Sequence, residues 1–568
     1  MNTGVSQKIE KMSGARMVVQ CLKRLGVDTI FGYPGGAILP IYDALYNSGI
    51  HHVSTRHEQA AIHAAEGYAR ATGKVGTVMV TSGPGATNLV TGIADAYMDS
   101  VPIVIFTGQV ATSMLGTDAF QEADVLGITL PVTKYSYQVH DPAEIPKIIQ
   151  EAYHVAGSGR PGPVLIDIPK DVSNAEAECQ YPDRISLPGY RVAEEPDPEQ
   201  IAKIATAIAQ ARRPLLYIGG GIIHAEASRE LRNFAKQANI PVVTTLMGLG
   251  AFEPDDPLFL GMLGMHGTYA ANMAAYECDL LIACGVRFDD RVTGKLERFS
   301  PHSKKVHIDI DPAEIGKNVA IDYPLVCDVR KALLRLLDQA PRPDSDAWVN
   351  QTTNRAQAFP LTYEQRPDGE LKPQFVIDYL SKVTEGKAIV TTEVGQHQMW
   401  AAHFYRVCQP RSFITSGGLG TMGFGFPAAM GAQLAKPDAT VVCIAGDASF
   451  QMNIQELQTI AEMNIPVKIF VINNHFLGMV RQWQEIFYDG RYSESRLSSP
   501  DFVKVAEAFH VKGIRATTKE EAERAIDEAL RYPGPIVVDF QVEEEESVFP
   551  MVPPGKGNNE MILGRWEG

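Results

Sequence analysis

The sequence has few cysteines and no long apolar runs. Its 568 residues include seven cysteines, none of which forms a CxxC pair. This argues against a zinc site or a disulfide framework and predicts a reducing, cytoplasmic location. No apolar run approaches the roughly 18 residues that a transmembrane helix needs. Residues 1–14 carry charge but no apolar segment, so we also expect no secretory signal.

The sequence also lacks an excess of positive charge. Acidic residues number 67 against 51 basic ones, which gives a formal net charge of −16. Phosphate backbones attract clustered Lys and Arg, so no nucleic-acid partner is expected, and the missing spans predict no membrane partner. Hydrophobic residues make up 45% and charged residues 21%. This balance excludes a disordered or fibrous chain, and the length predicts about three or four domains.

Short apolar runs of the kind that form buried parallel strands recur along the chain. Each ends in or near Gly, Asn or Asp, and they lie at 75–85, 101–108, 163–169, 214–221, 279–285, 305–311, 439–447, 466–474 and 535–540. Helical patterns lie between them, for example at 58–73 and 453–464. Repeated strand–helix–strand units predict an α/β fold whose parallel sheets are flanked by helices.

Two stretches rich in Pro and charge, 181–199 and 340–373, indicate domain boundaries, and the second is expected to contain a helix. The predicted domains are 1–185, 190–345 and 370–545, followed by a tail at 546–568. Segments 77–109 and 440–474 resemble each other, since both run strand, Gly turn, helix and Pro-started strand. We interpret them as two domains of one fold around a different middle domain. The alternative is that all such units look somewhat alike.

One pair of motifs carries metal-binding chemistry. Gly446-Asp447 and Asn473-Asn474 both follow predicted strands. In open parallel sheets, ligands bind at that edge. A carboxylate and an amide oxygen suit Mg²⁺, and a helix that begins at the Gly446 turn would favour a diphosphate. The alternative is that Asp447 only caps a helix and the two asparagines only form a turn.

These motifs resemble the GDG…NN metal–diphosphate motif of thiamine-diphosphate enzymes, with Ala448 in place of the third-position Gly. The resemblance covers nearly the whole chain and is greatest to the acetohydroxyacid synthase (acetolactate synthase) large-subunit family. The segments that carry it are YPGGAILP (33–40), RHEQAA (56–61), TSGPGATN (81–88), GTDAFQE (116–122), GRPGPVLIDIPKDV (159–172), GMHGT (264–268), GVRFDDRVTG (285–294), EVGQHQMWAA (393–402), GGLGTMGFGFPAA (417–429) and GMVRQWQ (478–484).

The resemblance implies three cofactors: thiamine diphosphate, Mg²⁺ and FAD. The first domain then binds the aminopyrimidine, the middle domain FAD, and the third domain the Mg²⁺-bound diphosphate. The implied Mg²⁺ ligands are Asp447, Asn474 and the carbonyl of Phe476. The implied contacts of the diphosphate and its surroundings are Val394, Gly395, Gln396, His397, Ala448, Ser449 and Met479. The implied FAD contacts are Arg160, Gly220, Gly221, Thr244, Met247, His266, Gly285, Arg287, Asp309 and Asp328.

For the reactive end of the cofactor, the resemblance implies a role for three residues. Glu58 hydrogen-bonds the aminopyrimidine and promotes loss of the C2 proton from the thiazolium, a relay that suits a carboxylate poised by burial. Met422 separates the two rings, and the Gly420 carbonyl accepts from the amino group. The alternatives from the residues alone are a Glu that favours a helix dipole and a core Met in a Gly-rich loop.

The substrate residues are likewise implied by the resemblance. Arg291 suits a substrate carboxylate, and Trp483 shapes the site for the second keto acid. The alternatives are a salt bridge from Arg291 to Asp289 or Asp290 and a packing role for Trp483. The full set is Gly36, Phe120, Gln121 and Lys170 from the first domain, Met265, Asp290 and Arg291 from the second, and Val480 and Trp483 from the third.

The implied activity is that of an acetohydroxyacid synthase, a transferase. Pyruvate is decarboxylated on thiamine diphosphate, and the hydroxyethyl carbanion joins a second pyruvate or 2-ketobutyrate. The products are 2-acetolactate or 2-aceto-2-hydroxybutyrate, early intermediates of branched-chain amino acid (isoleucine and valine) biosynthesis. The resemblance also implies a homodimer or larger assembly with active sites between subunits, a separate small regulatory subunit, and a tail that folds over the site as a lid. The alternatives are a pyruvate oxidase, a 2-keto acid decarboxylase and a non-catalytic nucleotide-binding scaffold.

Overall fold

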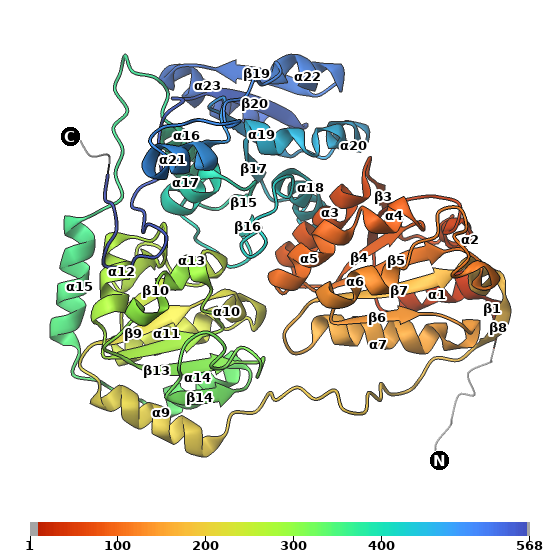
Figure 1. The fold of residues 1–568 in the computed structure, drawn as a ribbon, viewed down its shortest axis with the longest axis horizontal. Coiled ribbons are helices and arrows are strands. Elements are labelled where there is room, and N and C mark those ends of the chain that lie inside the picture. Colours follow the sequence, from red (N-terminus) through yellow and green to blue (C-terminus); the bar gives the residue numbers. More distant parts are fainter. Residues whose placement is uncertain (1–9, 565–568) are drawn as a thin grey trace. The chain divides into compact units, whose positions relative to one another are not determined.

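A computed structural model describes residues 10–564. Three six-stranded parallel sheets lie one after another along the chain, and helices flank each of them (Figure 1). The predicted α/β class is therefore confirmed. The described chain forms two compact units. The first unit contains residues up to 190 together with 418–438 and 451–467, and the second contains 191–417, 439–450 and the residues from 468 onward.

The N-terminal sheet lies in the first unit, and all its strands are parallel. Its strand order is β3-β2-β4-β5-β7-β6. A separate antiparallel pair joins β1 (Glu10–Ser13) to β8 (Glu176–Cys179). The sheet strands are β2 (Thr29–Tyr33), β3 (His51–Ser54), β4 (Gly76–Val80), β5 (Ile103–Gln109), β6 (Tyr135–Gln138) and β7 (Pro163–Pro169). The helices are α1 (Gly14–Arg24), α2 (Leu39–Leu45), α3 (Glu58–Thr72), α4 (Pro84–Thr87), α5 (Val90–Met98), α6 (Val125–Thr129), α7 (Ile145–Gly157) and α8 (Lys170–Asn174).

The middle sheet lies in the second unit and has the order β11-β10-β9-β12-β13-β14. Counted along the chain this is 3-2-1-4-5-6, the order of dinucleotide-binding folds. Its strands are β9 (Pro214–Ile218), β10 (Val242–Thr244), β11 (Phe259–Met262), β12 (Leu280–Cys284), β13 (Lys304–Asp309) and β14 (Tyr323–Val326). The helices are α9 (Pro198–Gln210), α10 (Gly220–His224), α11 (Ser228–Ala238), α12 (Tyr269–Glu277), α13 (Asp290–Thr293), α14 (Val329–Gln339) and α15 (Asp346–Ala358), and α15 is the helix expected within 340–373.

The C-terminal sheet, also in the second unit, has the order β16-β15-β17-β18-β20-β19. Counted along the chain, this is 2-1-3-4-6-5, the same order as in the N-terminal sheet, as the internal repeat predicted. Its strands are β15 (Ile389–Thr392), β16 (Phe413–Thr415), β17 (Val441–Gly446), β18 (Lys468–Asn473), β19 (Lys512–Ala516) and β20 (Ile536–Gln541). The helices in this part of the chain are α16 (Pro373–Val383), α17 (Gln396–Phe404), α18 (Gly425–Ala435), α19 (Asp447–Gln451), α20 (Leu457–Glu462), α21 (Gly478–Phe487), α22 (Phe502–Ala508) and α23 (Lys519–Arg531).

The division into units departs from the order of the chain at α18 and α20. Both helices follow β15 in sequence, yet they belong to the first unit. The domain boundaries expected from composition stay predictions. No helix among residues 10–564 is long and apolar enough to cross a membrane. The segment expected to lack a secretory signal lies mostly outside the described residues, as does the end of the tail beyond residue 564.

Two glycines allow α3 and α18 to pack closely in the first unit. A Cβ added at Gly431 would lie 1.8 Å from the backbone oxygen of Ala64, and one added at Gly67 would lie 2.0 Å from that of Ala428. Both distances are far below van der Waals contact. The helices approach each other backbone to backbone, and any larger residue must push them apart.

We therefore expect Gly431→Ala to destabilise the protein by about 1–3 kcal/mol through overpacking. Denaturant titration of the cofactor-free protein measures the effect as a lower unfolding midpoint. The matched control is Gly157→Ala in α7, where the nearest atom, a methyl carbon of Val75, would lie 3.4 Å from the new Cβ. Equal midpoints for the two variants would contradict the close packing.

Candidate active site

At the carboxyl edge of the C-terminal sheet, where β15 and β17 end, the residues around Gly395, His397 and Gly446 form a cluster that we call the cradle. The strand order reverses between these strands, which is where open sheets bind ligands. Gly395 follows β15, and Gly446 ends β17. A Cβ at Gly446 would lie 2.7 Å from the His397 ring, and one at Gly395 would lie 2.9 Å from it. The glycines therefore make room for this imidazole.

His397 contributes a neutral, buried imidazole to this cradle. Burial lowers its pKa to about 3. Its Nε2 is buried and has no hydrogen-bond partner. An unpaired buried nitrogen is costly unless a ligand satisfies it. Val394 borders the same place, because its carbonyl accepts from the Ser449 hydroxyl at 3.2 Å.

Asp447 and Asn474 supply oxygen atoms at the ends of β17 and β18. Asp447 is buried, burial raises its pKa, and its Oδ2 accepts from the Ser499 hydroxyl at 2.6 Å. After Asn474 the chain turns through a left-handed His475 (φ 56°), and the Phe476 N–H donates to Asn474 Oδ1 at 3.2 Å. A buried carboxylate beside an amide is a donor set that fits Mg²⁺. The residues present thus fit the metal that the resemblance implies.

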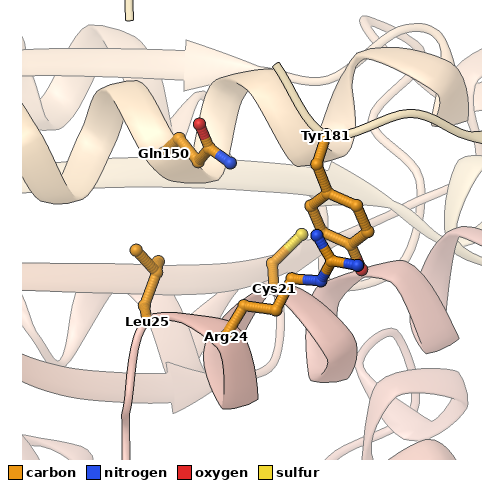
Figure 2. Close-up of a pocket in the computed structure, with 5 residues that line it drawn as sticks. All are labelled: Cys21, Arg24, Leu25, Gln150 and Tyr181. Atoms are coloured by element: carbon orange, nitrogen blue, oxygen red, sulfur yellow. The ribbon is translucent and has the colours of Figure 1, made fainter. Parts of the chain in front are cut away.

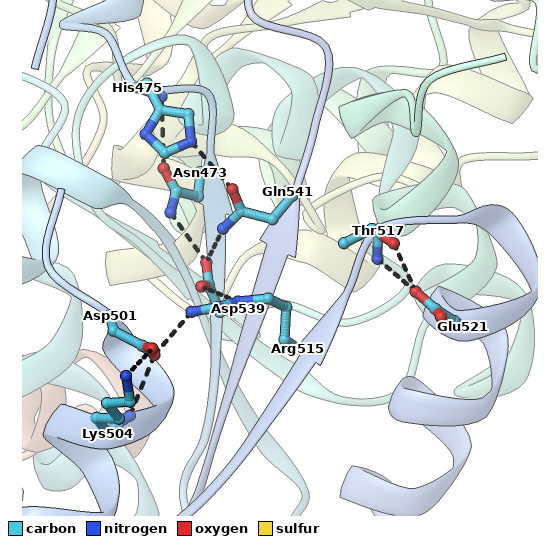
Figure 3. A network of polar contacts seen from close by, with 9 residues as sticks. All are labelled: Asn473, His475, Asp501, Lys504, Arg515, Thr517, Glu521, Asp539 and Gln541. Carbon is cyan, nitrogen blue, oxygen red and sulfur yellow. Dashed lines mark hydrogen bonds and ion pairs between the residues drawn. The ribbon is translucent and has the colours of Figure 1, made fainter. Parts of the chain in front are cut away.

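The two neighbouring asparagines have different partners. The Asn473 amide donates to Asp539 Oδ1 at 3.0 Å, and Asp539 also accepts from Arg515 and Gln541 (Figure 3). His475 bonds Gln541 at 3.0 Å in the same network. Asn473 therefore anchors the end of β18. Asn474, whose amide reaches Gln396 Oε1 at 3.2 Å, belongs to the cradle instead.

Gln396 links the cradle to α21 and to the tail. Its amide donates to Gln482 Oε1 and to the Glu546 carbonyl, both at 2.9 Å. Gln482 in turn donates to the Val548 carbonyl at 2.9 Å. Gly478, next to Met479, makes this possible, because a Cβ there would lie 2.1 Å from Gln396 Oε1. The first part of the tail is therefore packed against implied diphosphate residues and is not frayed.

Glu58 begins α3 in the first unit. The His57 ring caps the helix by accepting from the Gln59 N–H at 3.1 Å. Glu58 Oε2 accepts from the Asn88 amide at 2.9 Å, which fixes one oxygen of the carboxylate. Its Oε1 lies 3.5 Å from the Cβ position of Gly85, an ordinary van der Waals distance. One carboxylate oxygen is thus held by Asn88, and the other faces Gly85.

The segment 418–423, which contains Gly420 and Met422, is held by two carboxylates of the first unit. The Gly418 N–H donates to Asp99 Oδ1 at 2.7 Å, and the Thr421 hydroxyl donates to Asp95 Oδ1 at 2.9 Å. Arg70 of α3 supplies positive charge there, with Nη2 2.8 Å from Asp99 Oδ2. The segment is therefore held in place by side chains of the first unit and has a left-handed Gly420 (φ 73°), and the roles of Gly420 and Met422 stay predictions.

Four other implied substrate residues lie in the first unit, at the carboxyl ends of its strands or in the loops beyond them. Gly36 follows β2, and Lys170 follows β7 and is exposed. Gln121 adopts a left-handed backbone (φ 60°), and its carbonyl would lie 2.8 Å from a Cβ at Gly83. Phe120 is 88% exposed.

The second unit brings three implied substrate residues together. The Arg291 guanidinium lies 5.9 Å from the Trp483 ring centre, and its Nη1 is 3.9 Å from the Met265 sulfur. Asp290 is 3.9 Å from Arg291, but both side chains are mostly exposed, so this pair leaves the guanidinium open to a ligand. Val480, which lies about one turn before Trp483 on α21, is 47% exposed.

Nine of the ten implied FAD residues lie at the carboxyl edge of the middle sheet. Its order reverses between β9 and β12, and there a Cβ on Gly221 would lie 2.5 Å from Gly285 Cα. His266 is buried with no partner on Nδ1. This close glycine contact at the switch point fits a dinucleotide. Along the same edge, Gly220 begins α10, Thr244 ends β10, and Met247 lies 3.4 Å from the Cβ position of Gly220. Further along it, Arg287 follows β12, Asp309 ends β13 and Asp328 caps α14. Arg160 is the exception and lies in the first unit.

One pocket lies apart from all these residues. It has a volume of about 360 Å³ and is lined by Cys21, Arg24, Leu25, Gln150 and Tyr181 (Figure 2). The Arg24 guanidinium stacks 3.5 Å above the Tyr181 ring. Burial raises the pKa of the Cys21 thiol to about 12, so this sulfur is not a reactive thiolate. The pocket contains none of the predicted site residues.

Comparisons with known proteins agree with the site. Models of the thiamine pyrophosphate enzyme N-terminal TPP binding domain, central domain and C-terminal TPP binding domain match residues 12–128, 201–336 and 393–540. The acetolactate synthase large subunit of Parasynechococcus marenigrum is 53% identical over 97% of this chain and 91% of its own. The chain belongs to the acetolactate synthase large-subunit family. Two further relatives of this family are the large subunit from Corynebacterium glutamicum, 51% identical over 98% of this chain and 91% of its own, and the isozyme 2 large subunit from Escherichia coli K12, 50% identical over 97% and 99%.

The structure adds several residues to the candidate site that the sequence analysis did not name. Asn88 holds Glu58, Ser499 holds Asp447, and Gln482 joins Gln396 to the tail. Asp95 and Asp99 hold the segment around Gly420. Asn88 and Gln482 lie in segments that carry the resemblance, but the partners of all these residues are 30 or more residues away in sequence, and only the fold brings them together.

Proposed function

We propose that the chain is the catalytic subunit of an acetohydroxyacid synthase. It would convert two molecules of pyruvate to 2-acetolactate and CO2, or pyruvate and 2-ketobutyrate to 2-aceto-2-hydroxybutyrate and CO2. The observation that carries the proposal is the edge of the C-terminal sheet at β15, β17 and β18, which holds Asp447, Asn474 and a neutral His397 with an unsatisfied Nε2 in a chain that matches the thiamine pyrophosphate enzyme models. The products belong to branched-chain amino acid biosynthesis.

In this proposal Asp447, Asn474 and the Phe476 carbonyl would hold Mg²⁺, and the buried His397 imidazole would lie beside the diphosphate. Bound thiamine diphosphate supplies the nucleophilic carbon that accepts the keto acid and stabilises the charge left after decarboxylation. Glu58 holds and moves a proton at the aminopyrimidine, and Asn88 keeps its carboxylate oriented. Met422 and the Gly420 carbonyl orient the two rings, which the pinning of 418–421 supports.

Arg291 is proposed to bind the carboxylate of the second keto acid. Its fork of donors suits a planar carboxylate, and Trp483 beside it limits the volume left for the alkyl group. Gln121, Phe120, Gly36 and Lys170 complete the substrate set, together with Met265, Asp290 and Val480. FAD is assigned to the edge of the middle sheet, on the close contact of Gly221 with Gly285.

The assembly is also part of the proposal. The relatives are named large subunits, which supports a smaller partner chain for this one. A homodimer or larger assembly with active sites between two copies follows from the resemblance. The tail contacts of Gln396 and Gln482 support a lid over the site. Seven free cysteines support a cytoplasmic location.

The function is tested by NMR analysis of products. Purified protein is incubated without oxygen with pyruvate, 2-ketobutyrate, thiamine diphosphate, Mg²⁺ and FAD. We expect aceto-hydroxyacids that disappear when thiamine diphosphate is omitted. Acetaldehyde as the only product would instead indicate a decarboxylase, and product formation only after adding a quinone would indicate an oxidase. Inert mixtures, even with a small subunit supplied, would favour the non-catalytic scaffold.

A further inference from the structure

Glu456 is a buried carboxyl group that the proposed mechanism does not use. It ends a short 3-10 helix just before α20, and its side chain is fully shielded from solvent. Its Oε2 accepts from the Thr459 hydroxyl at 2.7 Å. A buried carboxyl group is expensive unless both oxygens are satisfied, so its second oxygen needs a specific partner.

That partner is the segment immediately before Glu58. Glu456 Oε1 accepts from the Arg56 backbone N–H at 2.8 Å, although the two residues are 400 positions apart. The backbone N–H of His57 also favours the charged form of this carboxyl and so lowers its pKa. Arg56 and His57 lead directly into α3, whose first residue is Glu58. The carboxylate therefore holds the two amides that set where α3 begins.

The Arg56 side chain reinforces the same contact from outside. Its Nη1 donates to the Ser54 carbonyl at 3.0 Å, and its Nη2 pairs with Glu462 at the end of α20. Glu462 is 62% exposed, so this ion pair contributes little by itself. Of the two acidic residues that contact Arg56, Glu456 is the buried one. Glu456, and not Glu462, accepts the hydrogen bond from the Arg56 backbone N–H.

We propose that Glu456 is a positioning residue for Glu58. It fixes the backbone of Arg56 and His57 and thereby places the Glu58 carboxylate for proton transfer at the aminopyrimidine. The inference rests on the proposed role of Glu58. A displacement of about 1 Å at a reacting group costs on the order of 100-fold in rate, so a backbone anchor two residues away has a measurable effect on catalysis.

The position also has a consequence for pH dependence. Burial raises the pKa of Glu456 to about 7, although hydrogen bonds from Thr459 and Arg56 lower it. The charged group that faces Glu456 is Arg56, and Glu462 lies beyond Arg56. Because the folded pKa lies above the ordinary value, the protonated form stabilises the fold. This stabilisation is complete below about pH 4 and is lost as the pH rises through about 7. The melting temperature of Glu456→Gln should not show this loss.

The test compares Glu456→Ala, which removes the acceptor, with Glu456→Gln, which keeps Oε1 facing the Arg56 amide. Glu462→Ala is the matched control, since it removes only the exposed ion pair. The first readout is hydrogen–deuterium exchange of the Arg56 and His57 amides in cofactor-free protein. We expect protection to fall at least tenfold in Glu456→Ala and to stay near wild type in the other two variants.

The second readout is exchange of the C2 proton of bound thiamine diphosphate with solvent deuterium, followed by NMR after acid quench. We expect a fall of about 10- to 100-fold in Glu456→Ala, recovery to within a few-fold of wild type in Glu456→Gln, and no change in Glu462→Ala. Wild-type exchange in Glu456→Ala would overturn the inference if Glu58→Gln, run alongside, is slow. Wild-type exchange in Glu58→Gln itself would instead overturn the proposed relay, and the positioning role with it.

Discussion

Glu58→Gln is expected to lower turnover by about 10²- to 10⁴-fold, the range for loss of a general acid–base group. Glutamine preserves the shape of the side chain, and its amide can turn so that its oxygen still accepts from Asn88. What is lost is a group that can hold and release a proton at the proposed position. Thiamine diphosphate and Mg²⁺ should bind nearly as well as to wild type, because their proposed ligands lie at β17 and β18.

The measurement is single-turnover product formation together with calorimetric titration of the cofactor. Glu58 is also the acidic residue in the first turn of α3, so its replacement weakens a favourable charge–dipole interaction. Glu520→Gln is the matched control, because Glu520 occupies the first turn of α23 and is exposed. It should change neither rate nor binding. Full turnover by Glu58→Gln would reject the proton relay and leave this residue with a helix-stabilising role.

The regular elements could be predicted from the sequence because their signals are local. The apolar runs at 439–447 and 466–474 are β17 and β18, and the helical pattern at 58–73 is α3. The same holds for the ends of strands, since Asp447 and Asn474 lie at the edge where the alternation of strands and helices placed them. Periodicity and turn residues depend on near neighbours, and near neighbours are visible in a sequence.

The contacts that orient the site residues could not be predicted in this way. Gly418 meets Asp99 across 319 positions, and Arg56 meets Glu456 across 400. A buried carboxylate that accepts from a backbone amide has no spacing rule, because any non-proline residue offers that amide. The grouping of α18 with the first unit has the same origin: it depends on how closely α18 approaches α3 at Gly431, and one glycine in a helix does not indicate its partner.

Asp447→Ala should abolish Mg²⁺-dependent binding of thiamine diphosphate, raising its dissociation constant by about 100-fold or more. Asp447 is the only one of the three proposed ligands with a formal charge, and a charge-assisted metal contact cannot be replaced by Asn474 and a backbone carbonyl. Calorimetric titration of the cofactor at increasing Mg²⁺ measures the effect. In wild type the affinity should rise with Mg²⁺, whereas in the variant it should stay low at every Mg²⁺ concentration.

Two companion variants separate metal binding from structure. Ser499→Ala removes the 2.6 Å hydrogen bond to Asp447 Oδ2 but keeps the carboxylate, so Mg²⁺-dependent binding should persist with a modest loss. Asp447→Asn keeps an acceptor for Ser499 but not the charge, and it should bind as poorly as Asp447→Ala. Because burial makes the charged form of this carboxylate costly, the cofactor-free Asp447→Asn protein should melt no lower than wild type. If the negative charge of Asp447 destabilises the cofactor-free protein and is needed only for Mg²⁺ binding, its role is functional and not structural. Tight cofactor binding by Asp447→Asn would show that Asp447 is not a metal ligand.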